Sequence, residues 1–359
     1  MRSWVAEGED PAGGIGRQNT PGRSGRRRLA VYLTAVGLLL SAGILSLAIG
    51  SVPIPLNVLL RLLAGQPVGE SSSVFGVIFF QLRLPRTVLV ALTGAALAGS
   101  GAAYQGLFRN PLADPFLIGV ASGAGLGAVL AMMIHWPYTT LGLLAVPAAA
   151  MVTGMATVGL VYLLARSGQD LQTGSLILAG VAVSSFATSL TSYLMLSSQG
   201  ELRRAIVWLL GGSSQSGWQP VVAALPYVLL GLGVLVLSGH SLNVLQFGDD
   251  QARQLGLPVN RVRLVIVTAA SLATAAAVAF SGIIGFVGLV VPHIVRLMLG
   301  PDYRRLVPLS VLGGAIMLLL SDVVARVVLA PQELPVGIVT ALLGAPFFLW
   351  VLQRSRQRG

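Results

Sequence analysis

The sequence contains no cysteine and no lysine. Without cysteine, the chain cannot form disulfides, thiolate nucleophiles or cysteine metal sites. Without lysine, it cannot contain the phosphate-binding loop GxxxxGK[ST], because that motif places a lysine on the phosphates. All 23 basic residues are therefore arginines. These absences exclude a thiol enzyme and an ATPase built on that loop.

Charge of either sign is scarce as well. Only 10% of the 359 residues are charged, 55% are hydrophobic, and the mean hydropathy is +0.82. A soluble chain of this length would lack polar cover for its surface. The sequence therefore predicts an all-α polytopic membrane protein. The net charge of +11 could indicate nucleic-acid binding, but arginines at membrane edges explain it more simply.

Apolar runs that can cross a bilayer recur from end to end. The stretch 262–299 is too long for one span of about 20–25 residues, and the small-residue sequence AFSGIIGFVG divides it into two. We therefore predict about ten transmembrane helices in one domain, 29–353. The expected spans are 29–50, 84–108, 115–134, 141–165, 174–196, 220–238, 262–280, 282–299, 306–330 and 335–353.

The two ends of the chain are polar. Residues 1–28 are rich in Gly, Pro and Arg, and we predict a disordered cytoplasmic tail. A secretory signal is the alternative, but no small-x-small cleavage site follows the apolar run, which favours an uncleaved first helix. Residues 354–359 are predicted to form a short basic cytoplasmic tail.

The distribution of arginines sets the orientation. With ten spans and a cytoplasmic N-terminus, 17 of the 23 arginines lie inside and six outside. Merging the two spans within 262–299 would move Arg304, Arg305 and the three C-terminal arginines outside, which the positive-inside rule disfavours. We therefore expect a multi-pass protein with both termini in the cytoplasm.

Three connecting segments are longer than the others. Residues 51–82 contain LNVLLRLLAG, which could form a short interfacial helix. Residues 197–219 also predict a short helix on the outer side. The inner loop 239–261 predicts a short helix that begins near Asp249 and Asp250, where the helix dipole favours acidic residues. We interpret this helix as a docking element for a separate ATPase, with a solvated loop helix as the alternative.

Charged residues also lie inside a predicted span. A charge at the bilayer centre costs about 2.5–3.5 kcal/mol on insertion scales. The i,i+4 spacing of Asp322 and Arg326 predicts an intramembrane ion pair on one helix face. The pair could be a packing salt bridge, or Arg326 could reach the outer surface.

Arg83 and Arg86 flank Pro85 at the start of a predicted span. Proline suits the first turn of a helix, so both arginines are expected near the outer face. Guanidinium groups match carboxylates well, which indicates docking to an acidic partner. Anchoring to lipid headgroups is the alternative.

Small residues and histidines carry less information. Gly119, Gly123 and Gly127 recur at four-residue spacing, as do Gly94 and Ala98, and both patterns predict close helix packing. The three histidines, 135, 240 and 293, are isolated in the sequence. We therefore predict no catalytic constellation and no metal site.

Several long stretches resemble the permease family of binding-protein-dependent ABC importers for iron–siderophores, haem and cobalamin, the type II importers. The resemblance runs from about residue 80 to 350. It rests on RLPRTVLVALTGAALAGSGAAYQGLFRNPLADPFLIGVASGAGLG, LILAGVAV, GDDQARQLGLPVNRVR, GIIGFVGLVVPHIVRLMLG and SDVVARVVLAPQELPVGIVTALLGAPFFLWVL, in the order of the family.

The resemblance implies a transport subunit rather than an enzyme, in a bacterial or archaeal cell (inner) membrane. Its partners would be two ATPase subunits that bind ATP-Mg, a second permease copy or homologous permease, and a periplasmic or lipid-anchored binding protein. No cofactor would be bound by this chain, and no nucleic acid.

The resemblance also assigns roles to residues. By similarity, Arg83, Arg86 and Arg326 would meet acidic residues of the binding protein. Similar permeases often have a hydroxyl residue at the position of Gly174, which would belong to the cytoplasmic gate, and this sequence departs from that pattern. The coupling loop to the ATPase would include Gly248, Asp249, Ala252, Leu255 and Gly256. The cytoplasmic gate would include Asn110, Leu112, Thr173 and Gly174. The translocation path would be lined by Ser184, Ser185, Thr188, Ser189 and Ser192.

The substrate is not fixed by these motifs, because siderophore, cobalamin and haem permeases share them. We rank iron(III)–siderophore first on the breadth of that group, cobalamin second and haem third. An ion-coupled secondary transporter is the alternative of another class, with Asp322 as its only plausible intramembrane acid. A membrane scaffold without transport is the third hypothesis.

Overall fold

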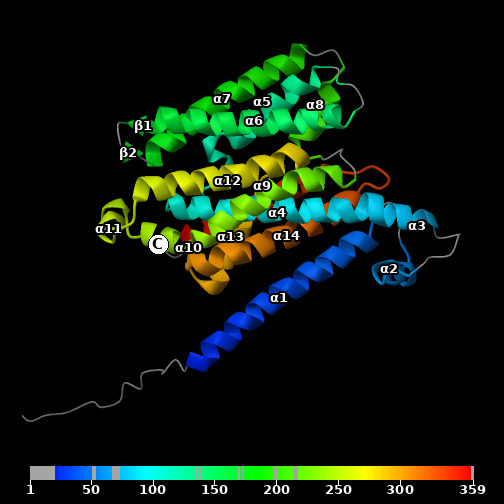
Figure 1. Cartoon of the computed structure of the whole chain (residues 1–359), viewed down its shortest axis with the longest axis horizontal. Helices are drawn as coiled ribbons and strands as arrows, with labels where there is room; N and C mark the ends of the chain where they lie inside the picture. Colours follow the sequence, from blue (N-terminus) through cyan, green and yellow to red (C-terminus); the bar gives the residue numbers. More distant parts are fainter. Residues whose placement is uncertain are drawn as a thin grey trace, which may run out of the picture.

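The computed structural model describes residues 21–50, 54–66, 73–134, 136, 139–167, 170–171, 173–197, 200–212 and 217–356. This part of the chain is mainly helical (Figure 1). Its helices are α1 (Pro21–Ala48), α2 (Leu56–Leu63), α3 (Ser73–Val77), η2 (Ile78–Arg83), α4 (Leu84–Leu107), η3 (Pro115–Ile118), α5 (Val120–Met132), α6 (Thr140–Ala165), α7 (Thr173–Ser197), α8 (Leu202–Leu209), α9 (Gln219–Leu237), α10 (Gly239–Leu245), α11 (Asp249–Gln254), α12 (Val259–Ser281), α13 (Val287–Leu299), α14 (Tyr303–Val327) and α15 (Val336–Arg356). The short strands β1 (Arg166–Ser167) and β2 (Asp170–Leu171) pair antiparallel between α6 and α7.

Each of the ten predicted spans coincides with an apolar helix. Within the described residues, seven helices are long and apolar enough to cross a membrane, and three shorter apolar helices lie at Val120–Met132, Val287–Leu299 and Val336–Val351. The division of the long apolar stretch is confirmed, because α12 ends at Ser281 and α13 begins at Val287.

The predicted ends of the spans differ from the structure at both termini. Helix α1 begins at Pro21, so the last part of the expected N-terminal tail is helical, and α15 continues to Arg356 into the expected C-terminal tail. Residues 1–20, residues 357–359 and His135 lie outside the described residues.

The core forms around α4 and α12, which lie next to each other in the middle of the bundle (Figure 1). Helix α4 is buried almost continuously from Thr93 to Leu107. Its glycines and alanines allow this, since Gly94 faces the backbone of Gly314 and Gly101 faces that of Gly288 so closely that a Cβ would collide. Small residues thus let α13 and α14 approach α4 directly.

Helices α5, α6 and α7 form a layer on one side of α12, and α13 and α14 lie on the other side of α4 (Figure 1). Gly123 and Gly127 pack against Thr157 and Thr153 of α6, as their four-residue spacing predicted. Helix α1 packs chiefly against α14 and lies at the edge of the bundle.

Helix α4 continues backwards through a π-helical turn, η2, into α3. The apolar helix Val74–Leu107 spans 34 residues, or about 50 Å, against a hydrocarbon thickness of about 30 Å. Its first turns therefore extend beyond the bilayer on the predicted outer side. The π turn ends at Arg83, and Arg86 lies in the first turn of α4 that follows.

Candidate functional site

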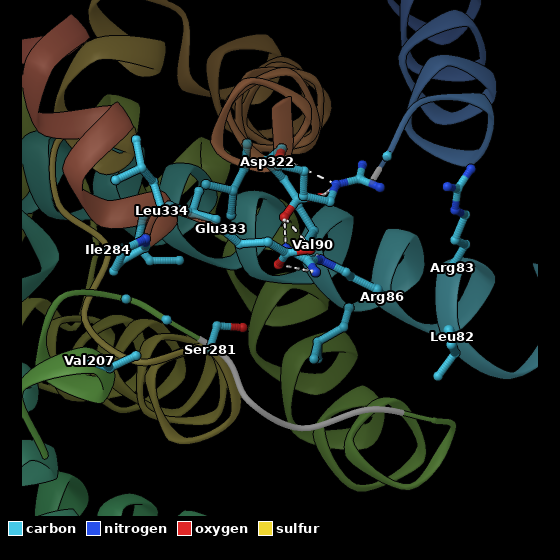
Figure 2. Close-up of a pocket in the computed structure, with 18 of the residues that line it drawn as sticks. Leu82, Arg83, Arg86, Val90, Val207, Ser281, Ile284, Asp322, Glu333 and Leu334 are labelled. Atoms are coloured by element: carbon cyan, nitrogen blue, oxygen red, sulfur yellow. Dashed lines mark hydrogen bonds and ion pairs between the residues drawn. The ribbon is translucent and has the colours of Figure 1, made fainter. Parts of the chain in front are cut away.

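A pocket of about 450 Å³ opens where α4 begins, at the predicted outer end of the bundle (Figure 2). Its walls come from η2, α4, α14 and the segment between α14 and α15, with contributions from the ends of α8 and α12. Apolar side chains such as Leu89, Val90 and Ile284 alternate with Arg83, Arg86, Asp322, Arg326 and Glu333. Segments far apart in the sequence thus bring five charged residues together.

Arg86 lies between two carboxylates. Its Nε and Nη2 donate to Asp322 Oδ1 at 3.1 and 2.9 Å, and its Nη1 donates to Glu333 Oε2 at 2.7 Å. Figure 2 shows these bonds as dashed lines. The side chain of Asp322 is 1% exposed, whereas that of Glu333 is 40% exposed. One partner of Arg86 is therefore buried and the other lies at the surface.

Arg326 completes the buried cluster. Its Nε lies 3.0 Å from Asp322 Oδ2, which is the ion pair that the i,i+4 spacing predicted. Its Nη atoms donate to the carbonyls of Ser46 and Ile49 at 3.1 and 2.9 Å and to Ser46 Oγ at 3.0 Å. The guanidinium thus joins α14 to the end of α1.

Arg83 contacts the same end of α1. Its Nη1 donates to the carbonyls of Leu47 and Ala48 at 2.8 and 3.0 Å, and in Figure 2 its side chain points toward that helix. The last carbonyls of a helix have no partner within the helix and carry the negative end of its dipole. Two arginines from different helices therefore cap α1 at its C-terminus.

This arrangement changes the interpretation of the three predicted docking residues. Arg83 and Arg326 are buried, and Arg326 lines the pocket instead of extending to the surface. The physical reason is the C-terminus of α1, whose carbonyls attract both guanidiniums. Arg86 keeps 32% of its side chain exposed and is the best placed of the three to meet an acidic partner. The docking role of all three stays a prediction.

The predicted coupling loop contains a short helix, α11, at the opposite end of the bundle (Figure 1). Gly248 and Gly256 flank it at φ values of 101° and 82°, in the left-handed region that glycine adopts without strain. Ala252 is fully buried and anchors the helix, while Leu255 is exposed. The loop therefore presents a small apolar surface on a fixed base, as a docking element requires.

Asp249 fixes the start of α11. Its Oδ2 accepts a hydrogen bond from Arg263 Nη2 at 2.9 Å, and its Oδ1 lies 3.6 Å from Arg109 Nη2. Arg263 belongs to α12, and Arg109 follows the end of α4. One carboxylate thus ties α11 to α12 and to the turn that follows α4.

The predicted gate residues lie in two segments. Asn110 and Leu112 form a turn after α4, in which the side-chain oxygen of Asn110 accepts from the Leu112 N–H at 2.9 Å. Thr173 and Gly174 begin α7, which packs against η3 through Gly180 and the carbonyl of Leu117. The structure thus connects the two segments through η3, and the gate role stays a prediction.

The predicted path-lining residues all lie on α7. Four of them are exposed, and Ser184 is partly exposed. The hydroxyls of Ser185 and Ser192 donate back to carbonyls of their own helix at 2.9 and 3.0 Å, so these two are already engaged within α7. Large apolar side chains share the exposed surface of α7, among them Phe186 and Leu196.

The sequence reasoning missed three residues that organise these sites: Glu333, Arg109 and Arg263. The signal for Glu333 was its place between a proline-containing loop and the start of the last span, within APQELP. A lone acid there could have suggested a partner for the nearby arginines. Within the described residues, no group of three or more His, Cys, Asp and Glu gathers in a way that could hold a metal ion.

Comparison with known proteins gives consistent matches. The model of the FecCD transport family matches residues 38–354. The chain is 40% identical over 337 residues to the uncharacterized ABC transporter permease protein YvrB of Bacillus subtilis, covering 92% of this chain and 96% of that protein. It is 45% identical over 282 residues to the cobalamin import system permease protein BtuC of Halobacterium salinarum, covering 79% and 75%.

A third relative and a solved structure extend these matches. The hemin transport system permease protein HmuU of Yersinia pestis is 40% identical over 288 residues, covering 78% of this chain and 84% of that protein. The structure of a metal-chelate type ABC transporter in an inward-facing conformation superposes with a TM-score of 0.77 at 31% identity, covering 91% of this chain and 99% of that chain.

Proposed function

The chain belongs to the FecCD transport family, and we propose that the chelate it imports is cobalamin. It is the permease of a type II ABC importer for metal chelates, a transport component whose ATPase is a separate subunit. The observation that carries the choice of cobalamin is the 45% identity with a permease named for cobalamin import. Vitamin B12 import permeases of Klebsiella and Salmonella at 41–42% identity support it.

Other chelates remain competing substrates. A hemin permease is 40% identical over a similar share of the chain, and iron(III)–siderophore ranked first in the sequence analysis on the breadth of that group. These chelates are bulky, and the exposed face of α7 carries small, apolar and hydroxyl side chains. We propose that this face lines the path between two permeases, because a weakly interacting wall releases such cargo quickly.

The two ends of the permease have different partners in this proposal. Arg86 receives a binding protein on the extracytoplasmic side, and α11 sits on an ATPase in the cytoplasm. Two observations support these assignments: Arg86 is partly exposed in the wall of a pocket, and α11 holds Ala252 buried and Leu255 exposed. The second permease is a copy of this chain or a homologue, in a bacterial or archaeal cell membrane with both termini in the cytoplasm.

The experiment combines binding and transport. The binding protein and ATPase encoded beside the permease gene are purified, and the affinity of the binding protein for cobalamin, hemin and an iron(III)–siderophore is measured. The complete importer is then reconstituted in proteoliposomes, and ATP-dependent uptake of each chelate is followed. Tight binding and uptake of cobalamin alone would support the proposal. Preference for hemin or a siderophore would reassign the substrate, and uptake driven by an ion gradient without ATP would contradict the importer itself.

A further inference from the structure

The two carboxylates that hold Arg86 differ in their surroundings. Asp322 is buried and also lies 3.0 Å from Arg326 Nε, so it must balance two guanidiniums at once. Within the described residues, the arginine that forms an ion pair with Glu333 is Arg86. The side chain of Glu333 is 40% exposed. A buried carboxylate is costly to detach, whereas an exposed ion pair contributes little and exchanges readily.

The charges of the pocket do not cancel. Three arginines face two carboxylates around the same cavity, which leaves one positive charge in excess when Glu333 is in place and two when it leaves. Charges at the mouth of a low-dielectric cavity attract an opposite charge from solution. The position of Glu333 on Arg86 is therefore the one place in this cluster where an external anion can replace a resident one without exposing a buried charge.

Glu333 also lies on a connecting segment, outside the helices of the bundle. It follows α14 and precedes α15, and the neighbouring backbone is held by the Leu334 N–H donating to the Ala325 carbonyl at 3.0 Å. Glu333, Leu334 and Pro335 form part of the wall of the pocket. Detachment of Glu333 from Arg86 would therefore free a guanidinium donor at the wall of the cavity.

We propose that Glu333 is a resident placeholder on Arg86, which a carboxylate of the extracytoplasmic binding protein displaces when it docks. The inference rests on the proposed function, because it requires a binding protein on this face. In the free permease Glu333 keeps Arg86 oriented and neutralised. In the docked complex the incoming carboxylate takes the Nη1 donor, and Asp322 holds the rest of the guanidinium unchanged. Glu333 thus lowers the affinity of docking and selects partners whose carboxylate reaches this position.

The test measures docking of the co-encoded binding protein to the permease in nanodiscs by surface plasmon resonance, at low and at physiological salt. In Glu333→Gln the competitor loses its charge, so we expect docking about two- to fivefold tighter, the range of an exposed ion pair. Glu201→Gln is the matched control, since Glu201 pairs with Arg204 at 3.6 Å on the predicted outer side away from the pocket, and it should leave the affinity unchanged.

A mutant cycle separates displacement from a general change of surface charge. In an Arg86→Gln background, docking weakens, and adding Glu333→Gln should then have no effect, because the contested donor is gone. An equal gain from Glu333→Gln in both backgrounds, or an equal gain from Glu201→Gln, would overturn the placeholder. If Glu333→Gln and the wild-type permease bind the protein with equal affinity, the placeholder is overturned too, while the proposed function stands. Failure of the wild-type permease to bind the protein at all would overturn both.

Discussion

The two ends of α4 use the same motif in different surroundings. At the outer end, Asp322 lies between Arg86 and Arg326 and is 1% exposed. At the inner end, Asp249 lies between Arg109 and Arg263 and is 30% exposed. Each carboxylate ties a peripheral element to the core: α1 through Arg326 at the outer end, and α11 at the inner end.

The difference in exposure indicates different tasks. A buried carboxylate between two guanidiniums is costly to separate, because each charge left alone in a low dielectric is poorly solvated. A partly exposed one can loosen while water replaces the lost bond. The outer cluster is therefore suited to hold a fixed frame around the pocket, and the inner bridge to let α11 shift, as its proposed coupling role would require.

The largest effect should come from the outer end. Asp322→Ala leaves Arg86 and Arg326 without their shared buried counter-charge, and we expect a loss of about 3–5 kcal/mol in the free energy of unfolding. Thermal unfolding in detergent measures it, with Glu201→Ala as a control for an exposed acid. A loss below about 1 kcal/mol would contradict a stabilising role for the cluster around Asp322.

A change to the inner bridge formed by Asp249, Arg109 and Arg263 should affect the free energy of unfolding less. It should affect the coupling of ATP hydrolysis to transport more. Asp249→Asn removes a charged partner from the buried Arg263, with an expected loss of about 1.5–3 kcal/mol. In the reconstituted importer, we expect more ATP hydrolysed per chelate transported. Asp250→Asn is the control, because Asp250 is 92% exposed and pairs with Arg253 of its own helix at 3.4 Å. Equal coupling ratios in the two variants would contradict the bridge.

The exposed partner of Arg86 should matter little for stability. Glu333→Gln is expected to change the free energy of unfolding by less than about 0.5 kcal/mol, because the pair is surface-exposed and Asp322 continues to hold Arg86. The measurement is the same detergent unfolding assay used for Asp322. A loss as large as that of Asp322→Ala would place Glu333 in the frame rather than at its exchangeable edge.

A further effect is on pH dependence, and it concerns a carboxylate outside the spanning helices for which the described residues show no arginine partner. Asp114 accepts from the Phe116 N–H at 2.7 Å, and burial raises the pKa of its carboxyl to about 6. Because this pKa lies above the unfolded value of about 3.9, the folded state binds the extra proton, and stability rises as pH falls from about 7 to 4.

Asp114→Asn keeps the turn-capping oxygen and removes the titration. The side chain of Asp114 is only partly buried, so solvent screens its charge. We therefore expect the pH-dependent difference in the free energy of unfolding to be about 1 kcal/mol or less. Unfolding curves of wild type and variant between pH 4 and 7 check it. Parallel pH profiles for the two proteins would contradict this role of Asp114.

The sequence predicted the elements well because local signals determine them. Hydropathy located the ten apolar helices, and amphipathic stretches located α2, α8 and α11. The i,i+4 spacing predicted the contact of Asp322 with Arg326, since both lie on one helix turn. Small-residue spacing indicated close packing, although it could not name Gly314 as the neighbour of Gly94.

The outer cluster was only half predictable. Arg83 and Arg326 turn inward because tertiary packing brings the end of α1 beside them, and no pattern in the sequence encodes that approach. Glu333 meets Arg86 across 247 residues of chain. The short hairpin of β1 and β2 was not predicted, because two-residue strands leave no periodic pattern to recognise.

The capping of α1 has a mechanical consequence. In α1 the buried side chains, Ala42, Ser46 and Leu47, lie in its last two turns, and most of the preceding residues from 29 onward are exposed. With 28 residues, the helix is about 42 Å long, clamped at one end by two guanidiniums. A tilt of about 5° at this capped end would displace the opposite end of the helix by about 4 Å. Small rearrangements around the outer pocket would therefore be amplified at the N-terminal end of α1.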